Sequence, residues 1–397
     1  MTNLLWPGDH RAGELMTDQA LLASMVAVES AWLATLAAHG LAPPADLGQL
    51  IQPRDREILA AGAEDGGNPV IGLVSLLRER TTPEVSRWIH RGLTSQDVLD
   101  TSLMLGARAA VDTLTTQLSE QISTLSDLAA THRTTPMVAR TMTQHAVPTT
   151  FGAKVAGWLN GVVDAYHQLR ALRYPIQIGG AGGTLAATTE LASSEVSIQL
   201  VHATADALNL EVSAPWHTTR APVTALADAL VGCTDAWGHI ASDIVTLARP
   251  EIAELSEPAA ANRGGSSSMP HKRNPVLSIL IRRATLAAPP LAATLHTAAA
   301  LAHDERPDGT WHAEWDTLRT LARRTVVAGS QCTELVSGLE VHADRMAENL
   351  DGADVFSEQR DIAQLAGKAA SPAYFGSVER IIDDSLDQAR RILEGHQ

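Results

Sequence analysis

The sequence predicts an all-α protein built as a bundle of long helices, and three observations favour this class. Alanine and leucine dominate the 397 residues, aromatic residues make up only 4%, and apolar residues make up 45%. Such a composition favours helices over a β-sandwich, which is rich in β-branched and aromatic residues. Apolar residues also recur every three or four positions over long stretches, which is the helical period. The chain exceeds the usual size of a single compact domain, so we expect several domains or one long multi-helix body.

The first helix is predicted over residues 17–39. Thr17 is a suitable N-cap, and Gly40 is a typical C-terminal stop. A second long helix begins near Asp97, with an apolar stripe that includes Leu114, Leu118 and Ile122. Further helices are predicted over residues 150–172, 190–208, 221–248, 275–303, 316–338 and 376–393, and Asp344 is placed to cap one more. The three loops that interrupt this pattern lie at residues 176–184, 214–222 and 257–275.

Charge and cysteine content exclude several function classes. The net charge is −15, whereas proteins that bind nucleic acid or anionic membranes in a general way are usually basic. The two cysteines, Cys233 and Cys332, have no metal-ligand spacing and do not form a disulfide framework. We see no basic-then-apolar targeting segment at the start and no uninterrupted apolar run long enough to span a membrane. We therefore expect a soluble, cytoplasmic protein.

The segment Asn262–Pro275 carries the clearest chemistry. It reads NRGGSSSMPHKRNP, a hydroxyl-rich loop with the cations Arg263, Lys272 and Arg273. In an acidic protein such a cluster suggests a bound anion, and Lys272 is one of only three lysines. A Ser/Gly connector with solvated charges is the plain alternative. We find neither zinc or magnesium ligand spacing nor a dinucleotide fingerprint, so we expect no metal and no cofactor.

The string GSSSMPHKRNP resembles the signature loop of the fumarase/aspartase superfamily, GSSxMPxKxN, at every fixed position. Residues 88–97 (WIHRGLTSQD) and 139–148 (ARTMTQHAVP) resemble the superfamily's other two conserved regions, in the expected order. Within the superfamily the chain most resembles the 3-carboxy-cis,cis-muconate cycloisomerases, and it is adenylosuccinate lyase-like in its signature loop. The strings that carry this closer resemblance are TPMVARTMTQHAVPTTFG (135–152), GGAGGTLAA (179–187), PWHTTR (215–220) and WHAEW (311–315).

The resemblance implies a fold of three parts and an activity. The fold is a small N-terminal helical domain (1–100), a central long-helix bundle (101–340) and a shortened C-terminal helical segment (341–397). The activity is a cofactor-free addition of a carboxylate across a double bond to give carboxymuconolactone, in the protocatechuate branch of aromatic degradation. The partners are a small polycarboxylate substrate and further copies of the chain in a homotetramer with shared sites, with neither nucleic acid nor membrane.

Site residues follow from the resemblance. Ser266, His145 and Lys272 match the catalytic positions, with Ser266 as the proton-transferring residue and Lys272 stabilising the extra charge of the intermediate. The substrate-binding positions are His90, Thr94, Ser95, Gln144, Arg263, Ser267, Met269, Asn274 and Arg306. A serine acts as a base only if its oxyanion is strongly stabilised, and Lys272 together with loop or helix amides is a means to do so.

Position 142 bears on the reaction type. Adenylosuccinate lyases typically carry histidine there, whereas this chain has Met142 and places the histidine at His145, as bacterial cycloisomerases do. An amine leaving group needs a proton from a general acid, but a carboxylate leaves as a stable anion. The alternatives therefore are a lyase that releases fumarate from a succinate derivative, including a C–N lyase with a good leaving group, and a catalytically silent helical scaffold.

Several motifs have structural alternatives. The Gly179–Gly183 run lacks the lysine of a phosphate-binding loop and is interpreted as a tight interhelical turn. Trp311 and Trp315 share a helix face and are interpreted as packing residues, while His217 stays open between structure and site. Two features depart from the cycloisomerases: WHTTRAP replaces their usual WHTQRD, and a block of the C-terminal domain is shortened.

Overall fold

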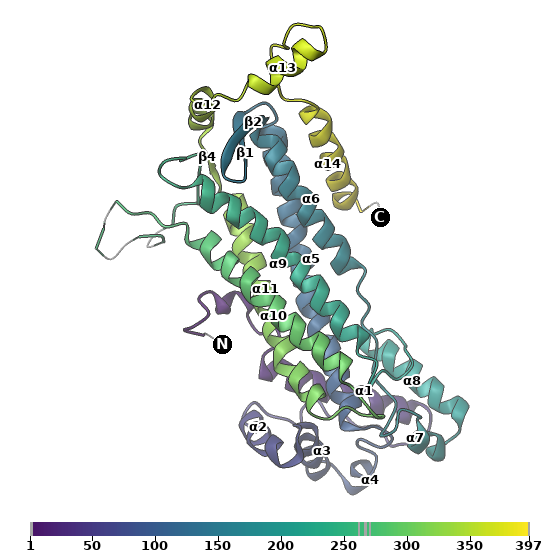
Figure 1. Cartoon of the computed structure of the whole chain (residues 1–397). Helices are drawn as coiled ribbons and strands as arrows, with labels where there is room; N and C mark the ends of the chain where they lie inside the picture. Colours follow the sequence, from purple (N-terminus) through teal and green to yellow (C-terminus); the bar gives the residue numbers. More distant parts are fainter. Residues whose placement is uncertain (1–2, 261–262, 266–267, 270, 396–397) are drawn as a thin grey trace. The chain divides into compact units, whose positions relative to one another are not determined.

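The computed structural model describes residues 3–260, 263–265, 268–269 and 271–395 (Figure 1). Over these ranges it contains fourteen α-helices and two short two-stranded sheets, which confirms the all-α prediction. The long helices are α1 (Asp18–Ala38), α5 (Ser95–Thr131), α6 (Phe151–Arg170), α8 (Ser194–Leu208), α9 (Ala221–Leu247), α10 (Val276–Ala300), α11 (Gly309–Ser337) and α14 (Val378–Leu393). The short ones are α2 (Asp55–Gly66), α3 (Val70–Glu79), α4 (Pro83–Ser86), α7 (Ala186–Leu191), α12 (Ala343–Asp351) and α13 (Ser357–Leu365).

Two compact units divide the chain, and each is assembled from three separate segments. Unit 1 comprises Met1–Asp112, Ala171–Asp228 and Pro289–Arg324, and unit 2 comprises Thr113–Arg170, Ala229–Ala288 and Thr325–Gln397. Helices α5, α9, α10 and α11 supply residues to both units. The division into three domains at residues 100 and 340 stays a prediction.

Unit 1 holds α1 at the centre of two apolar clusters. The Thr17 hydroxyl accepts a hydrogen bond from the Ala20 N–H at 3.2 Å, so the predicted N-cap is present. Along α1, Val28, Trp32 and Leu36 are fully buried, and the helix packs against α8 and α2. By length and composition alone, α1 and α10 could each cross a membrane. In α1, however, half of the relevant window is buried within the protein.

Unit 2 is a helical bundle in which one buried polar side chain links three helices. Leu114, Leu118 and Ile122 of α5 are fully buried, as the stripe predicted. Between them and α9, the Gln121 side chain accepts from the Trp237 indole at 2.7 Å. The same side chain donates to the Gly329 carbonyl of α11 at 3.1 Å, so one amide links three helices. Helix α14 packs along α6 (Figure 1).

The structure differs from the sequence expectations at several places, and α12 begins at Ala343, before the expected cap Asp344. Strands β1 (Pro136–Thr141) and β2 (Gln144–Thr150) form an antiparallel hairpin where no strand was expected. The helix expected over 190–208 is two helices, α7 and α8, because Ser193 is an N-cap whose hydroxyl accepts from the Val196 N–H. Helix α11 begins at Gly309 rather than near residue 316. The remaining strands, β3 (Leu255–Ser256) and β4 (Glu340–Val341), pair antiparallel.

Candidate functional site

The first conserved region lies in unit 1, in the turn that leads from α4 into α5. Thr94 is buried, and its hydroxyl accepts a hydrogen bond from Arg306 Nη1 at 3.0 Å across 212 residues of sequence. The Arg306 guanidinium also lies over the Trp311 ring, 5.1 Å from its centroid. Two predicted substrate-binding residues are therefore in direct contact. A guanidinium, a hydroxyl and the N-terminus of α5 at Ser95 form a group of donors suited to a carboxylate.

His90 lies in the same turn and is held by a residue that the sequence did not reveal. Its Nδ1 is 2.6 Å from Oε1 of Glu29, a fully buried carboxylate of α1. The His90 side chain is anchored through Nδ1 and keeps 16% of its surface exposed. Glu29 is 61 residues away and sits within an apolar helix pattern, and no motif marks it.

Asp97 fixes this turn to the glycine-rich segment of unit 1. The fully buried carboxylate accepts hydrogen bonds from the backbone N–H groups of Thr94, Gly179 and Gly180 at 2.9–3.0 Å. It also lies 2.8 Å from His217 Nε2. The Gly179–Gly183 run is therefore a turn, as expected, and it binds a carboxylate of its own chain. His217, which the sequence left open, is 4% exposed and makes a structural contact.

Next to His217 lies a buried ionic group, formed by one residue from the PWHTTR string, one from the WHAEW string and an aspartate of α5. Arg220 is 2% exposed and contacts both Asp100 and Glu314. Burial alone lowers the pKa of Arg220, but these two carboxylates outweigh it and the pKa is raised. Burial raises the pKa of Glu314, and Arg220 offsets only part of that effect. Trp311 donates its indole N–H to Asp100 at 2.9 Å, so its role is structural packing.

The second conserved region is the β1–β2 hairpin of unit 2. Met142 and Thr143 form its two-residue tip with φ of 48° and 74°, the left-handed geometry that suits a tight hairpin. Met142 is 96% exposed, and the predicted residues Gln144 and His145 on β2 are exposed as well. Close to this tip the hairpin is held by Arg140, whose guanidinium makes two bonds to the buried Glu254 at 2.7 and 3.0 Å.

The third conserved region, the signature loop, is described only in part. Ser266 and Ser267, predicted as the proton-transferring serine and a binding hydroxyl, lie outside the described residues. Asn274 bonds the Gly264 carbonyl through both its backbone and its side chain, at 2.8 and 3.0 Å, and so closes the base of the loop. Arg263 forms an ion pair with Glu334. Lys272 and Met269 are exposed.

Glu257 caps the N-terminus of α10, the helix that follows this loop. Its two carboxylate oxygens accept the N–H groups of Leu277 and Ser278, the first turn of α10, at 3.0 and 2.7 Å. A carboxylate at this end of a helix stabilises the unpaired N–H groups and the helix dipole. The loop base also lines a cavity of about 340 Å³ in unit 2, whose lining includes Arg263, Arg273 and Asn274.

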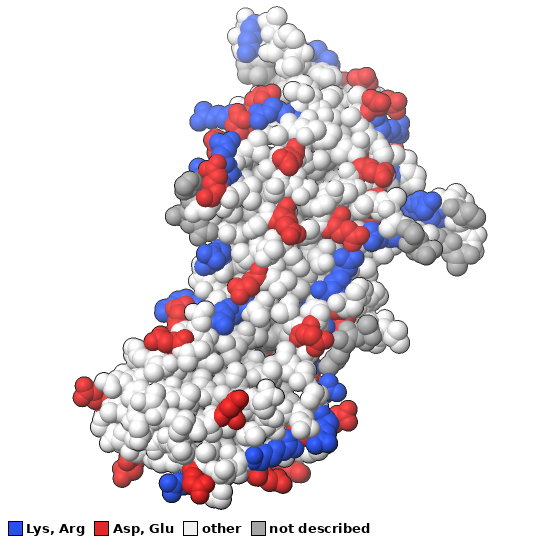
Figure 2. All heavy atoms as spheres, turned by 180° about the vertical axis from the view of Figure 1, so that it is seen from behind, with Lys and Arg blue, Asp and Glu red and all other residues white. Residues whose placement is uncertain are grey.

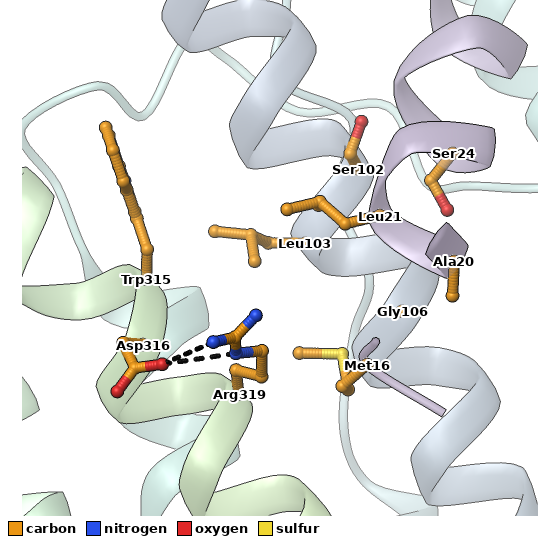
Figure 3. Close-up of a pocket in the computed structure, with 10 residues that line it drawn as sticks. All are labelled: Met16, Ala20, Leu21, Ser24, Ser102, Leu103, Gly106, Trp315, Asp316 and Arg319. Atoms are coloured by element: carbon orange, nitrogen blue, oxygen red, sulfur yellow. Dashed lines mark hydrogen bonds and ion pairs between the residues drawn. The ribbon is translucent and has the colours of Figure 1, made fainter. Parts of the chain in front are cut away.

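An apolar cavity of about 220 Å³ lies elsewhere in unit 1, between α1, α5 and α11 (Figure 3). Leu21, Leu103 and Trp315 form much of its wall, and the Asp316–Arg319 ion pair is among the lining residues. Because no predicted site residue lines it, this cavity is separate from the predicted site.

The surface shows no concentration of one charge on the face drawn in Figure 2. Lysine and arginine side chains alternate there with aspartate and glutamate side chains, and broad areas carry neither. The predicted anion-binding residues are thus a local feature of an acidic protein, since the whole chain carries a net charge of −15.

The predicted residues are divided between the two units. Thr94, Ser95, His90 and Arg306 belong to unit 1, where Arg306 contacts Thr94. Gln144 and His145 belong to unit 2, together with Arg263, Met269, Lys272 and Asn274. Within the described part of the chain, neither the Lys272 ammonium nor the His145 imidazole has a hydrogen-bond or ion-pair partner, so both are available to an anion. The roles assigned to these residues stay predictions.

The chain is similar to known lyases and cycloisomerases. The model of the lyase family matches residues 54–287. The nitrosuccinate lyase of Streptomyces davaonensis is 42% identical, over 90% of this chain and 79% of its own length. The 3-carboxy-cis,cis-muconate cycloisomerase of Bradyrhizobium diazoefficiens is 40% identical, over 84% of this chain and 75% of its own length.

A solved structure extends the agreement to the fold. The 3-carboxy-cis,cis-muconate lactonizing enzyme from Pseudomonas putida superimposes with a TM-score of 0.81 at 32% identity, covering 97% of this chain and 86% of that chain. Sequence motifs, family match and fold all point the same way. The chain belongs to the lyase family of the fumarase/aspartase superfamily, and it is an enzyme of that superfamily.

Proposed function

We propose that this enzyme lactonises 3-carboxy-cis,cis-muconate by adding one substrate carboxylate across a carbon–carbon double bond. A C–O bond forms at one alkene carbon, and the neighbouring carbon, which lies next to another carboxylate, takes up one proton. Carboxymuconolactone is the product, and no electrons are gained or lost. The relatives named as cycloisomerase and lactonizing enzyme support this choice.

The observation that carries the proposal is the residue at the hairpin tip. Met142 is 96% exposed and has no proton to give, in the position where amine-expelling lyases carry histidine. In the reverse direction of lactonisation the leaving group is a carboxylate, which departs as a stable anion near neutral pH. The reaction therefore does not need a general acid at position 142.

The rest of the site supplies cations and hydrogen-bond donors. In unit 1, Arg306 and Thr94 are joined by a 3.0 Å hydrogen bond and would bind one substrate carboxylate. Lys272 would stabilise the second negative charge that develops on the carboxylate next to the reacting carbon. In our proposal Ser266 transfers the proton at that carbon, and His145 and Gln144 contact the substrate from the hairpin.

A second candidate function is elimination of nitrite from nitrosuccinate to give fumarate. It is favoured by the 42% identity to a nitrosuccinate lyase. The string WHTTRAP also departs from the WHTQRD of the cycloisomerases. Nitrous acid is about as acidic as a carboxylic acid, so nitrite also leaves without a general acid at position 142. One C–N bond and one C–H bond break in this reaction, and the proton goes to an enzyme base.

A substrate panel separates the candidates. The purified enzyme is mixed with 3-carboxy-cis,cis-muconate, nitrosuccinate or adenylosuccinate, and we measure muconate absorbance, nitrite and fumarate. Loss of muconate absorbance with formation of the lactone is the expected result. Nitrite and fumarate in equal amounts would replace the proposal with the second candidate. Turnover of adenylosuccinate would refute the argument from Met142, and no turnover in any arm would refute both candidate functions.

We further propose that the enzyme works as a homotetramer with sites shared between subunits. The support in this chain is α10, whose outward face exposes Ile279 (48%) and Leu286 (76%). Exposed aliphatic residues of this size on a long helix favour burial against other helices. A second copy of the chain is the partner that the superfamily resemblance implies.

A further inference from the structure

One face of α1 holds the turn that carries His90. Glu29 and Trp32 lie three residues apart and therefore on the same side of the helix. Glu29 Oε1 is 2.6 Å from His90 Nδ1, and the Trp32 indole donates to the Arg91 carbonyl at 2.7 Å. Two successive residues of the turn are thus bound to a single helix that belongs to the core of unit 1.

The backbone of this turn is strained at His90. Its φ is 63°, a left-handed conformation that is uncommon for any residue with a side chain. Gly92 follows with φ of 88°, and a Cβ at that position would come within 2.6 Å of the Thr188 hydroxyl. Such strain persists only where the surroundings hold it, and it concentrates at functional sites.

Among the described residues, Glu29 has no second hydrogen-bond partner that explains its burial. It is 1% exposed, and its other oxygen, Oε2, makes no hydrogen bond to any described residue. Burial and Arg91 lower the pKa of Arg78, whereas Glu29 raises it, so Arg78 lies within electrostatic range of Glu29 without bonding it. Burying a carboxylate is costly unless it is paired, and here the direct pairing is with His90.

We infer that Glu29 is a positioning residue that holds the His90 imidazole in one orientation, with Nε2 presented to the substrate. When Glu29 is ionised, its carboxylate only accepts hydrogen bonds, and Nδ1 then carries the proton of the pair. The ring cannot turn over without breaking the 2.6 Å contact. Nε2 makes no hydrogen bond to a described residue and the side chain keeps 16% of its surface exposed, so Nε2 is the nitrogen left for the substrate. This inference rests on the proposed function only in that His90 contacts a polycarboxylate substrate.

A double-mutant cycle between Glu29 and His90 tests the inference, using whichever substrate of the panel is turned over. Glu29→Leu should lower kcat/KM by about 10- to 100-fold, the usual cost of losing a partner that orients a functional histidine. The loss should appear in the same parameter, KM or kcat, in which His90→Ala shows its own loss. Glu29→Gln keeps an oxygen that accepts from Nδ1 and should fall in between. In the His90→Ala background, Glu29→Leu should change kcat/KM by less than about twofold.

Asp55→Asn is the matched control, because Asp55 is an equally buried carboxylate of unit 1 that pairs with Arg80 and touches no predicted site residue. It should lower stability and leave kcat/KM unchanged. If Glu29→Leu lowers kcat/KM as much in the His90→Ala background as in the wild type, Glu29 does not act through His90 and the inference is overturned. If His90→Ala has wild-type kinetics, the assignment of His90 to the site fails instead. Thermal unfolding of each variant verifies the fold, and the Glu29→Gln comparison stands if Glu29→Leu does not fold.

Discussion

Asp97 Oδ1 and His217 Nε2 lie 2.8 Å apart in the core of unit 1, although 120 residues separate them in the chain. The same carboxylate accepts the backbone N–H groups of Thr94, Gly179 and Gly180. One side chain therefore fixes both the turn before α5 and the glycine-rich turn. The position of Thr94, and through it the Arg306 contact, depends on this carboxylate.

Asp97→Asn should consequently destabilise the protein and impair catalysis together. Asparagine has one oxygen acceptor where aspartate has two, and its NH2 group would face backbone N–H donors. At least one of these buried N–H groups therefore loses its acceptor. We expect a loss of about 2–4 kcal/mol in the free energy of unfolding, measured by urea denaturation. Asp127→Asn, an exposed substitution on the same helix, is the control and should change little. Equal stability of the two variants would show that Asp97 does not hold these turns.

Removing Arg220 should lower the free energy of unfolding more than its position in a loop motif suggests. Arg220→Met leaves Asp100 and Glu314 buried without their guanidinium, and breaking such a group costs about 3–5 kcal/mol. The double variant Arg220→Met/Glu314→Gln should be more stable than Arg220→Met, because one orphaned charge is gone. A double variant less stable than Arg220→Met would contradict this account.

The loss of stability caused by Arg220→Met should also depend on pH. Burial raises the pKa of Glu314 even with Arg220 present, so the folded state binds its proton more tightly than the unfolded state. A carboxyl group of this kind lowers stability as pH rises above about 4, its unfolded pKa. Without Arg220 the effect grows, and the deficit of the variant should therefore be larger at pH 7 than at pH 5. A deficit independent of pH would exclude Glu314 as its cause.

The contribution of Asp55 to stability should depend on pH in the opposite direction. The hydrogen bond from Arg80, aided by the Gln52 N–H, lowers the pKa of Asp55 to about 2. A carboxylate with a lowered pKa contributes stability above its unfolded pKa of about 4, and that contribution is lost as pH falls toward 2. The stability difference between the wild type and Asp55→Asn should thus be greatest above pH 4 and should shrink between pH 4 and pH 2. Urea denaturation across this range measures it, and a constant difference would contradict the pairing with Arg80.

The sequence predicted the fold better than it predicted the site. Helices with clear caps and an apolar stripe were placed to within a few residues, as for α1 and α9. The hairpin was missed because its turn residues, Met142 and Thr143, are not the asparagine and glycine that usually mark a two-residue turn. Their left-handed backbone is stabilised by pairing along β1 and β2, which a local pattern does not show.

The site residues came from motifs, and their supporting partners came only from the structure. Glu29 and Glu314 are buried acids on helices, and Glu254 is a buried acid directly before β3. Each binds a cationic or imidazole side chain distant in sequence. Single-sequence patterns report the period of a helix but not which helices lie side by side. For that reason the motif residues could be proposed from the sequence, whereas the carboxylates that orient them could not.

Lys272→Ala should reduce turnover strongly without reducing stability. Lys272 is exposed and bonds no other described side chain, so its removal breaks no structural contact in the part of the chain described. In the proposed reaction it stabilises charge that develops next to the reacting carbon, and losing such a contact costs about 2–4 kcal/mol in the transition state. Steady-state kinetics and a thermal melt are measured on the same preparation. Kinetics close to the wild type would remove Lys272 from the site.

The last prediction concerns the sharing of sites between subunits. If Ser266 and His145 in one site come from different chains, two inactive variants should complement each other. Ser266→Ala and His145→Ala are denatured together in equal amounts and refolded as a mixture. A site then needs its serine from a His145→Ala subunit and its histidine from a Ser266→Ala subunit, each with a chance of one half. Random assembly should therefore restore about a quarter of wild-type activity. His145 is exposed on β2, so its removal should not prevent refolding. Wild type and each single variant, carried through the same procedure, are the controls. A mixture as inactive as either parent, or a monomer by light scattering, would contradict the shared-site model while leaving the chemistry of the site open to the substrate panel.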